Sequence, residues 1–313
     1  MKFAFVFPGQ GSQAVGMMAA YLTTAGDDPV IRDTFAEASN ALGFDLWDMV
    51  ANGPAEALNQ TVNTQPAMLA AGVAVYRLWL ARGGEKPALM AGHSLGEYTA
   101  LTCAGALEFA DAIRLVRLRA EAMQSAVPEG VGAMAAILGL DDDGVRAACA
   151  EAAQGEVLEA VNFNSPGQVV IAGNKAAVER GMALAKGKGA KRALPLPVSV
   201  PSHCALMQPA AEKLRTALAA INVRVPVIPV LHNADVAAHD SADTIRDALA
   251  RQLFSPVRWV ESMLALRDQD VQLIVECGPG KVLAGLNKRT LNIPTLAIAD
   301  AATLGDVLEK SKA

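Results

Sequence analysis

The sequence predicts an α/β protein: a large domain with a mostly parallel sheet, and a smaller subdomain inserted into it. Three observations lead to this prediction. Strand and helix patterns alternate in residues 1–127 and 199–313, as in parallel sheets covered by helices on both faces. Residues 128–198 instead follow the order strand, helix, strand, strand, helix, strand. A chain of 313 residues is also long enough to bury about 75% of its unfolded surface, which suits one large domain with a small insertion.

The first elements of the large domain follow from apolar runs and turn residues. Residues 3–7 (FAFVF) are apolar and end at the segment PGQGSQ, which predicts a buried strand that runs into a tight loop. Helices are expected at about 29–42 and 66–82. Residues 87–105 then predict a strand, a sharp turn and a helix. Residues 112–123 (AIRLVRLRAEAM) contain good helix formers without Gly or Pro, and therefore predict a further helix.

The inserted segment has its own closed pattern. Its expected elements are a strand at 132–138, a helix at 141–153, strands at 157–163 and 168–174 joined by the turn NSPG, a helix at 175–186 and a strand at 190–200. This βαββαβ order is that of a ferredoxin-like fold. We therefore expect residues 128–198 to form a ferredoxin-like subdomain between the two stretches of the large domain.

The large domain resumes after this insertion. Its expected elements are a helix at about 204–221, a strand at 225–231, helices at about 241–253 and 256–268, and a strand in 271–280 that ends in a glycine turn.

The composition excludes several classes of protein. Hydrophobic residues make up 52% and charged residues 19% of the chain, which is typical of a globular protein with a large core. The net charge of -5 argues against a nucleic-acid-binding protein. No run of 18 strongly apolar residues predicts a membrane span, and Pro8 and Gly9 end the apolar N-terminus too early for a signal peptide. We expect a cytoplasmic protein whose four scattered cysteines are thiols.

The sequence also lacks the usual metal and nucleotide motifs. The four histidines form no HExxH motif and no Cys/His cluster with zinc spacing. Neither GxGxxG nor GxxxxGK[ST] occurs. We therefore expect neither a metal nor a nucleotide cofactor.

The segment GHSLG, residues 92–96, matches the G-x-S-x-G pattern of a nucleophile elbow. Glycines on either side of a serine allow a strained strand-to-helix turn, because neighbouring backbone can then pass close to it. The Ser94 hydroxyl would project at the N-terminus of the following helix, where the Leu95 N–H and the helix dipole can stabilise an oxyanion. The alternative is a tight turn with a structural role only.

A nucleophilic serine needs a base, and the four histidines are the candidates. His203 is favoured because it follows a strand and opens a helix, where active-site groups gather in open α/β sheets. The alternative for His203 is an ordinary helix start. His93 adjoins Ser94 and would point elsewhere, His239 lies in a polar surface stretch, and His232 follows an apolar run without further support.

Arg119 lies on the wrong face of its predicted helix. Arg117 and Glu121 fall on one polar face, where their i,i+4 spacing suits a surface ion pair. Arg119 projects to the opposite side, between Leu115 and Met123, in the stripe that should face the core. It is either an internal salt-bridge partner or a cation held for a ligand.

Five motifs in this order resemble one family. They are FVFPGQGSQ, GHSLGEYTA, NFNSPGQVVIAG, VPSHCALM and ECGPGKVL. Together they resemble the malonyl-CoA:acyl carrier protein transacylase family of bacterial fatty-acid synthesis, over essentially the whole chain. The resemblance implies an α/β-hydrolase-like large domain with a ferredoxin-like insertion.

The resemblance also implies roles for individual residues. Ser94 corresponds to the nucleophile and His203 to the base of a dyad without an acidic third member. The backbone carbonyl of Gln252 corresponds to the group that orients this histidine. The N–H groups of Gln10 and Leu95 correspond to the oxyanion donors.

The remaining implications concern the substrate. Arg119 corresponds to the arginine that binds the malonyl carboxylate, and an acetyl group would leave that guanidinium without its partner. The implied reaction is a ping-pong transfer from malonyl-CoA to the phosphopantetheine thiol of acyl carrier protein, in a monomer. A serine hydrolase on the same elbow is the second hypothesis, and a carrier-binding module without catalysis is the third.

Two local features leave alternatives open. A basic stretch in the small subdomain is either a docking patch for an acidic carrier protein or an ordinary helix end, where lysines are favoured; it contains Lys186, Lys188, Lys191 and Arg192. The pair His232-Asn233 stands where relatives commonly have two asparagines, so the local hydrogen bonding is expected to change while catalysis survives.

Overall fold

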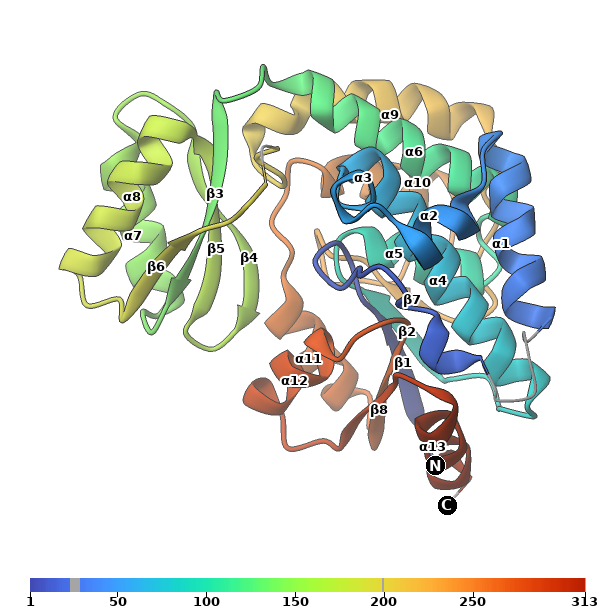
Figure 1. The fold of residues 1–313 in the computed structure, drawn as a ribbon. Coiled ribbons are helices and arrows are strands. Elements are labelled where there is room, and N and C mark those ends of the chain that lie inside the picture. The colour runs from blue at the N-terminus through green and yellow to red at the C-terminus, as the bar shows by residue number, and fades with distance from the viewer. Residues whose placement is uncertain (23–28, 199, 313) are drawn as a thin grey trace.

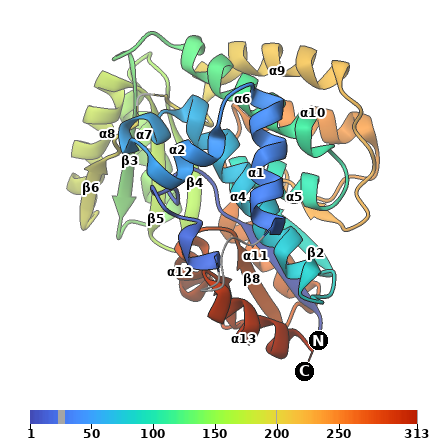
Figure 2. The same ribbon diagram turned by 45° about the vertical axis from the view of Figure 1, so that its right-hand side comes forward.

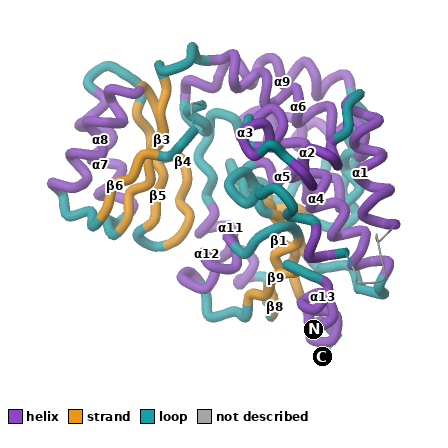
Figure 3. The backbone as a smooth tube through the Cα atoms, in the orientation of Figure 1, coloured by secondary structure: helices purple, strands orange, loops and turns teal. Residues whose placement is uncertain are grey.

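The computed structural model describes residues 1–22, 29–198 and 200–312, and it confirms the predicted α/β class with two separate sheets. Figure 1 shows the sheet of the inserted segment with its helices on one side of the molecule and the larger helical part, built on the second sheet, on the other. The tube in Figure 3 makes the separation of the two groups of strands easiest to follow.

The larger sheet is parallel throughout. Its strands are β1 (Phe3–Phe7), β2 (Leu89–Gly92), β7 (Val230–Leu231), β8 (Leu273–Cys277) and β9 (Thr295–Ile298). They are ordered β7-β2-β1-β8-β9, and each neighbouring pair runs parallel. The central strand β1 is buried over its whole length, which explains its continuous apolar run.

Helices cover both faces of this sheet. They are α1 (Pro29–Leu42), α2 (Leu46–Asn52), α3 (Ala55–Leu58), α4 (Thr61–Ala81), α5 (Leu95–Cys103), α6 (Phe109–Ala126), α9 (Gln208–Ala220), α10 (Ala242–Gln252), α11 (Trp259–Asp268), α12 (Val282–Thr290) and α13 (Ala301–Ser311), with 3-10 turns η1 (Ala19–Tyr21) and η2 (Ala205–Met207). No helix among the residues described is long and apolar enough to cross a membrane.

The side chains of β1 alternate between two cores. Phe3, Phe5 and Phe7 pack in the cluster that includes α1, α4 and α6, which lie beside one another in Figure 2. Ala4 and Val6 point the other way, into the cluster with residues of α11 and α12. This alternation follows from the two-residue period of a strand.

The smaller sheet carries the predicted βαββαβ order. Its elements are β3 (Gly132–Leu138), α7 (Asp142–Ala153), β4 (Leu158–Ser165), β5 (Gln168–Asn174), α8 (Lys175–Gly187) and β6 (Arg192–Pro195). The strands are ordered β4-β5-β3-β6 and all pairs are antiparallel. The division of the chain after residues 127 and 198 remains a prediction, and Ser199 lies outside the described residues.

Prolines shorten two elements that the apolar pattern predicted to be longer. The run 225–231 forms a strand only at Val230–Leu231, because Pro226 and Pro229 offer no N–H to a ladder. The strand expected at 190–200 ends at Pro195. The helix expected at 204–221 starts with the 3-10 turn η2 and becomes α-helical only at Gln208.

Candidate active site

Ser94 lies at the sharp junction between β2 and α5. Its backbone has φ 52° and ψ −108°, a strained conformation for a residue with a side chain. The flanking glycines are sterically required, because a Cβ on Gly92 would lie 1.9 Å from the carbonyl group of Gly96, and a Cβ on Gly96 would lie 2.0 Å from the Phe7 carbonyl oxygen. The local sequence therefore produces the elbow that the motif predicted.

His203 is the histidine that reaches the Ser94 hydroxyl. Its Nε2 lies 2.8 Å from Ser94 Oγ, and its Nδ1 lies 2.8 Å from the Gln252 carbonyl oxygen. A carbonyl only accepts, so Nδ1 carries the proton and Nε2 is left to accept from the hydroxyl. His203 also has a positive φ of 66°, so both partners of this contact are held in strained backbone conformations.

The imidazole of His203 is held in its neutral form. It is 2% exposed, and burial together with the nearby Arg119 charge lowers the pKa of His203 to about 3. A neutral ring is the form that can take a proton from serine.

Two free N–H groups lie beside the elbow. Among the hydrogen bonds of the described residues, none uses the backbone N–H of Gln10 or of Leu95. The loop that carries Gln10 approaches closely because residue 9 is glycine: a Cβ there would lie 2.5 Å from the His93 carbonyl oxygen and 3.7 Å from the Leu95 nitrogen. The arrangement can therefore offer two donors to one oxygen, as an oxyanion hole does.

Arg119 turns inward from α6 and is 1% exposed. Its Nη1 donates to Gln65 Oε1 at 2.7 Å, and its Nη2 donates to Gln252 Oε1 at 3.0 Å and lies 3.4 Å from Ser94 Oγ. Its Nε has no partner among the described residues. In that part of the chain no carboxylate forms an ion pair with Arg119, so the internal salt bridge considered above is not found. Within the described ranges, the hydrogen-bond acceptors of this buried cation are all neutral oxygens.

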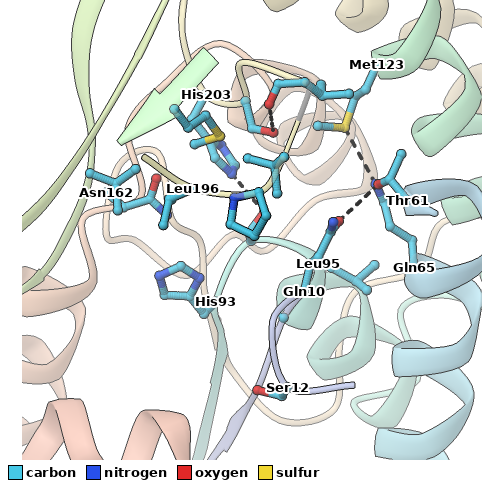
Figure 4. Close-up of a pocket in the computed structure, with 18 of the residues that line it drawn as sticks. Gln10, Ser12, Thr61, Gln65, His93, Leu95, Met123, Asn162, Leu196 and His203 are labelled. Carbon is cyan, nitrogen blue, oxygen red and sulfur yellow. Dashed lines mark hydrogen bonds between the residues drawn. The ribbon is translucent and has the colours of Figure 1, made fainter. Parts of the chain in front are cut away.

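A cleft of about 700 Å³ between the two sheets is lined by residues of this site, among them Ser94, Arg119 and His203. The large domain contributes the elbow, Gln65 and Met123, and the small sheet contributes Met134, Asn162 and Val170, among others. Figure 4 shows Gln10, Thr61 and Gln65 on one side of the cleft and His93, Asn162 and Leu196 on the other. An extended substrate can therefore lie between the two parts of the molecule with one end at Ser94.

The other three histidines do not contact the Ser94 hydroxyl. His93 Nε2 bonds Asn164 Oδ1 at 2.7 Å. His232 Nδ1 bonds Glu97 Oε1 at 2.7 Å, and His239 Nε2 bonds Asp235 Oδ2 at 3.1 Å.

The chain matches proteins of known family over almost its full length. A family model described as an acyl transferase domain matches residues 4–310. The malonyl CoA-acyl carrier protein transacylase of Escherichia coli strain K12 is 58% identical over 309 residues, which cover 98% of this chain and 99% of that protein. The chain belongs to the malonyl-CoA:acyl carrier protein transacylases of the acyl transferase family.

Solved structures of transacylases agree with this membership. The acyl carrier protein S-malonyltransferase of Vibrio cholerae O1 biovar eltor superposes with a TM-score of 0.95 at 58% identity, covering 98% of this chain and 100% of that one. A malonyl-transacylase in complex with a type II PKS acyl-carrier protein superposes with a TM-score of 0.97 at 56% identity, covering 99% and 100%. This chain is thus an acyltransferase with the two-part fold of those enzymes.

Three residues of this transacylase site were not predicted from the sequence. Gln65 accepts from Arg119, Asn233 accepts the Ser94 N–H through Oδ1 at 2.8 Å, and Glu97 accepts from three neighbours. The available signal in the sequence was a polar residue within an apolar helical segment. It applies to Gln65 in α4 and Glu97 in α5, both of which the structure buries.

Other features of the transacylase do not add a second chemical centre. No group of His, Cys, Asp and Glu side chains that could hold a metal is found in the described ranges. All four cysteines are free, and burial raises the pKa of each thiol.

In the basic stretch of the small subdomain, Lys188 pairs with Glu151 at 2.8 Å, and Lys186, Lys191 and Arg192 are exposed.

Proposed function

We propose that this enzyme transfers the malonyl group from malonyl-CoA to the phosphopantetheine thiol of acyl carrier protein, through a malonyl ester on Ser94. The relatives named for this reaction, and the relative solved with an acyl-carrier protein, support the two substrates. We further propose a cytoplasmic monomer that serves fatty-acid synthesis. The proposed reaction uses side chains and backbone N–H groups of this chain and no cofactor.

In the first half-reaction, His203 Nε2 takes the Ser94 proton while Oγ attacks the thioester carbonyl carbon. The N–H groups of Gln10 and Leu95 stabilise the negative charge that develops on the carbonyl oxygen. The C–S bond then breaks, and the proton on His203 passes to the departing sulfur of coenzyme A. The malonyl group is left as an ester on serine.

In the second half-reaction, the carrier thiol enters the same cleft. His203 takes the thiol proton, and sulfur attacks the ester carbonyl above the same two N–H donors. The C–O bond to Ser94 breaks, and the proton returns from His203 to the serine oxygen. His203 is neutral at the start and the end of both halves, consistent with its lowered pKa.

One observation carries the malonyl assignment: the buried Arg119 cation has no carboxylate partner within the described part of the chain and lies 3.4 Å from the nucleophile. A guanidinium fork suits a carboxylate, and a desolvated pair is stronger than an exposed one. A malonyl ester on Ser94 would bring its free carboxylate to this cation. An acetyl ester would not.

The test is the mass of the intact protein after incubation with malonyl-CoA without an acceptor. We expect the wild-type chain to gain the mass of one malonyl group, and Ser94→Ala to gain none. Ser125→Ala is the matched control, because Ser125 lies outside the cleft and contacts Lys213; it should be acylated like the wild type. Acylated Ser94→Ala protein would refute the assignment.

A second measurement separates a transferase from a hydrolase. Consumption of more than one equivalent of malonyl-CoA per enzyme molecule should require a holo carrier protein or another thiol, because the ester on Ser94 then waits for a thiol acceptor. Rapid consumption without an acceptor, with free malonate as the product, would favour the hydrolase hypothesis instead.

A further inference from the structure

Glu97 is a buried carboxylate that the proposed reaction does not use. It lies in the first turn of α5, directly after the elbow, and it is fully buried. Its Oε1 accepts from His232 Nδ1 at 2.7 Å, and its Oε2 accepts from the Asn233 backbone N–H at 2.9 Å and from Gln252 Nε2 at 2.9 Å. We propose that Glu97 is a positioning residue, which acts through Gln252 and Asn233 to fix the substrate-binding guanidinium and the nucleophile.

The first link is the side-chain amide of Gln252. Its Nε2 lies between two acceptors, the Ser94 carbonyl oxygen at 2.9 Å and Glu97 Oε2 at 2.9 Å. Its Oε1 therefore faces Arg119 Nη2, which donates to it at 3.0 Å. A rotated amide would place its NH₂ group against the guanidinium, donor against donor. Glu97 thus helps to orient the Gln252 amide so that its oxygen, and not its NH₂ group, faces Arg119.

The amide also keeps two buried charges apart. A direct ion pair between Glu97 and Arg119 would neutralise the cation that the substrate carboxylate needs. With Gln252 between them, the carboxylate polarises the amide and so stabilises the buried guanidinium indirectly. Arg119 keeps its unpartnered Nε and remains available to a ligand.

The second link is Asn233, at the end of β7. Glu97 holds its backbone N–H, while its side chain accepts from the Ser94 N–H at 2.8 Å and donates to the Gly92 carbonyl oxygen at 2.7 Å. These two side-chain bonds support the elbow where the backbone of Ser94 is strained. One carboxylate therefore contacts the supports of both reacting groups.

The test is a double-mutant cycle on kcat/KM for malonyl-CoA, and it rests on the proposed roles of Ser94 and Arg119. Glu97→Gln preserves the shape of the side chain but removes its negative charge, so the Gln252 amide no longer donates to a carboxylate. We expect a loss of about tenfold to a hundredfold, as for a small misplacement of reacting groups. Gln252→Ala keeps the backbone carbonyl that holds His203. The double variant should lose much less than the product of the two single losses, because both changes break the same link.

Two further readouts separate positioning from general loosening of the fold. The inhibition constant of free coenzyme A should stay at the wild-type value, because Glu97 lies behind the elbow and outside the residues that line the cleft. Glu276→Gln is the matched control. Glu276 is a second fully buried glutamate, which accepts the N–H groups of Leu283 and Ala284 at the start of α12. Any loss of kcat/KM in Glu276→Gln should multiply with the loss in Gln252→Ala when the two changes are combined.

Several results would overturn the proposal. The first is a wild-type value of kcat/KM in Glu97→Gln. The second is a double variant in which the losses of Glu97→Gln and Gln252→Ala multiply. The third is failure of both Glu97→Gln and Glu97→Asp to fold, which would make Glu97 a folding residue. A wild-type enzyme that transfers no malonyl group would refute the proposed function instead. The same cycle is then measured with an acyl thioester that the wild type accepts.

Discussion

Nη2 of Arg119 lies 3.4 Å from Oγ of Ser94, although Arg119 lies in α6 and Ser94 precedes α5, 25 positions earlier in the chain. The guanidinium therefore stands beside the nucleophile, held by two glutamine side chains, Gln65 and Gln252. A short diacid thioester can place its reacting carbonyl at the serine and its free carboxylate at the arginine.

Replacing Arg119 by alanine should lower kcat/KM for malonyl-CoA by about 10²–10³-fold, the effect of removing one partner from a buried ion pair. Turnover of acetyl-CoA should fall far less, or rise, because an acetyl group has no carboxylate to lose. Steady-state kinetics with both thioesters check this. Arg114→Ala is the control, since Arg114 lies on the same helix but pairs with Asp111 at the surface. Equal losses for both thioesters would mean that Arg119 has a structural role.

Replacing Gly9 by alanine should impair the oxyanion hole without removing a side chain from it. The new Cβ would lie 2.5 Å from the His93 carbonyl oxygen, so the loop that carries Gln10 must move. Loss of one oxyanion donor lowers kcat by about 10²–10³-fold, and we expect a fall of about that size with little change in KM. Gly305→Ala is the control, because nothing lies near its Cβ in α13. Wild-type kcat in Gly9→Ala would remove Gln10 from the proposed mechanism.

The lowered pKa of His203 predicts a specific acid sensitivity. The pKa of His203 is about 3 in the folded protein, whereas an ordinary histidine has a pKa of 6.5. Between these two pH values the unfolded chain therefore binds a proton that the folded protein does not. Stability contributed by the neutral ring is therefore lost as pH falls from 6.5 toward 3. Compared with His203→Gln, the wild type should lose up to about 1.4 kcal/mol more of unfolding free energy per pH unit in that window.

Denaturant titrations of the two proteins at several pH values between neutrality and mild acid measure this difference. Parallel stability curves for the wild type and His203→Gln would show that His203 titrates near its ordinary value. The same lowered pKa predicts that kcat/KM shows no loss attributable to His203 near pH 6.5, since the base stays unprotonated there.

The sequence predicted the features that depend on local geometry. The elbow at Ser94 follows from glycine sterics within five residues, and the inward direction of Arg119 follows from helical periodicity. The pairing of Ser94 with His203 joins residues 109 positions apart. The position of His203 after a strand favoured it without excluding the other histidines, and the family resemblance then implied its role as the base.

The missed residues depend on tertiary contacts. Asn233 supports Ser94 from a strand end 139 positions away, and Gln65 meets Arg119 across two helices. Their chemical type alone gives no hint of these partners. The apolar pattern also overestimated the length of the strand at 225–231. Two prolines in that run lack the N–H groups that strand pairing needs, and hydrophobicity does not record this.

The raised pKa values of the four cysteines have a consequence for chemoselectivity. The proposed substrates are a thioester and a carrier thiol, and thiol–thioester exchange needs a thiolate as the attacking group. Burial keeps Cys103, Cys149, Cys204 and Cys277 protonated, so none of them is poised to intercept an acyl group. In the proposed reaction, the Ser94 oxygen would therefore carry the acyl group without competition from the enzyme's own cysteine thiols.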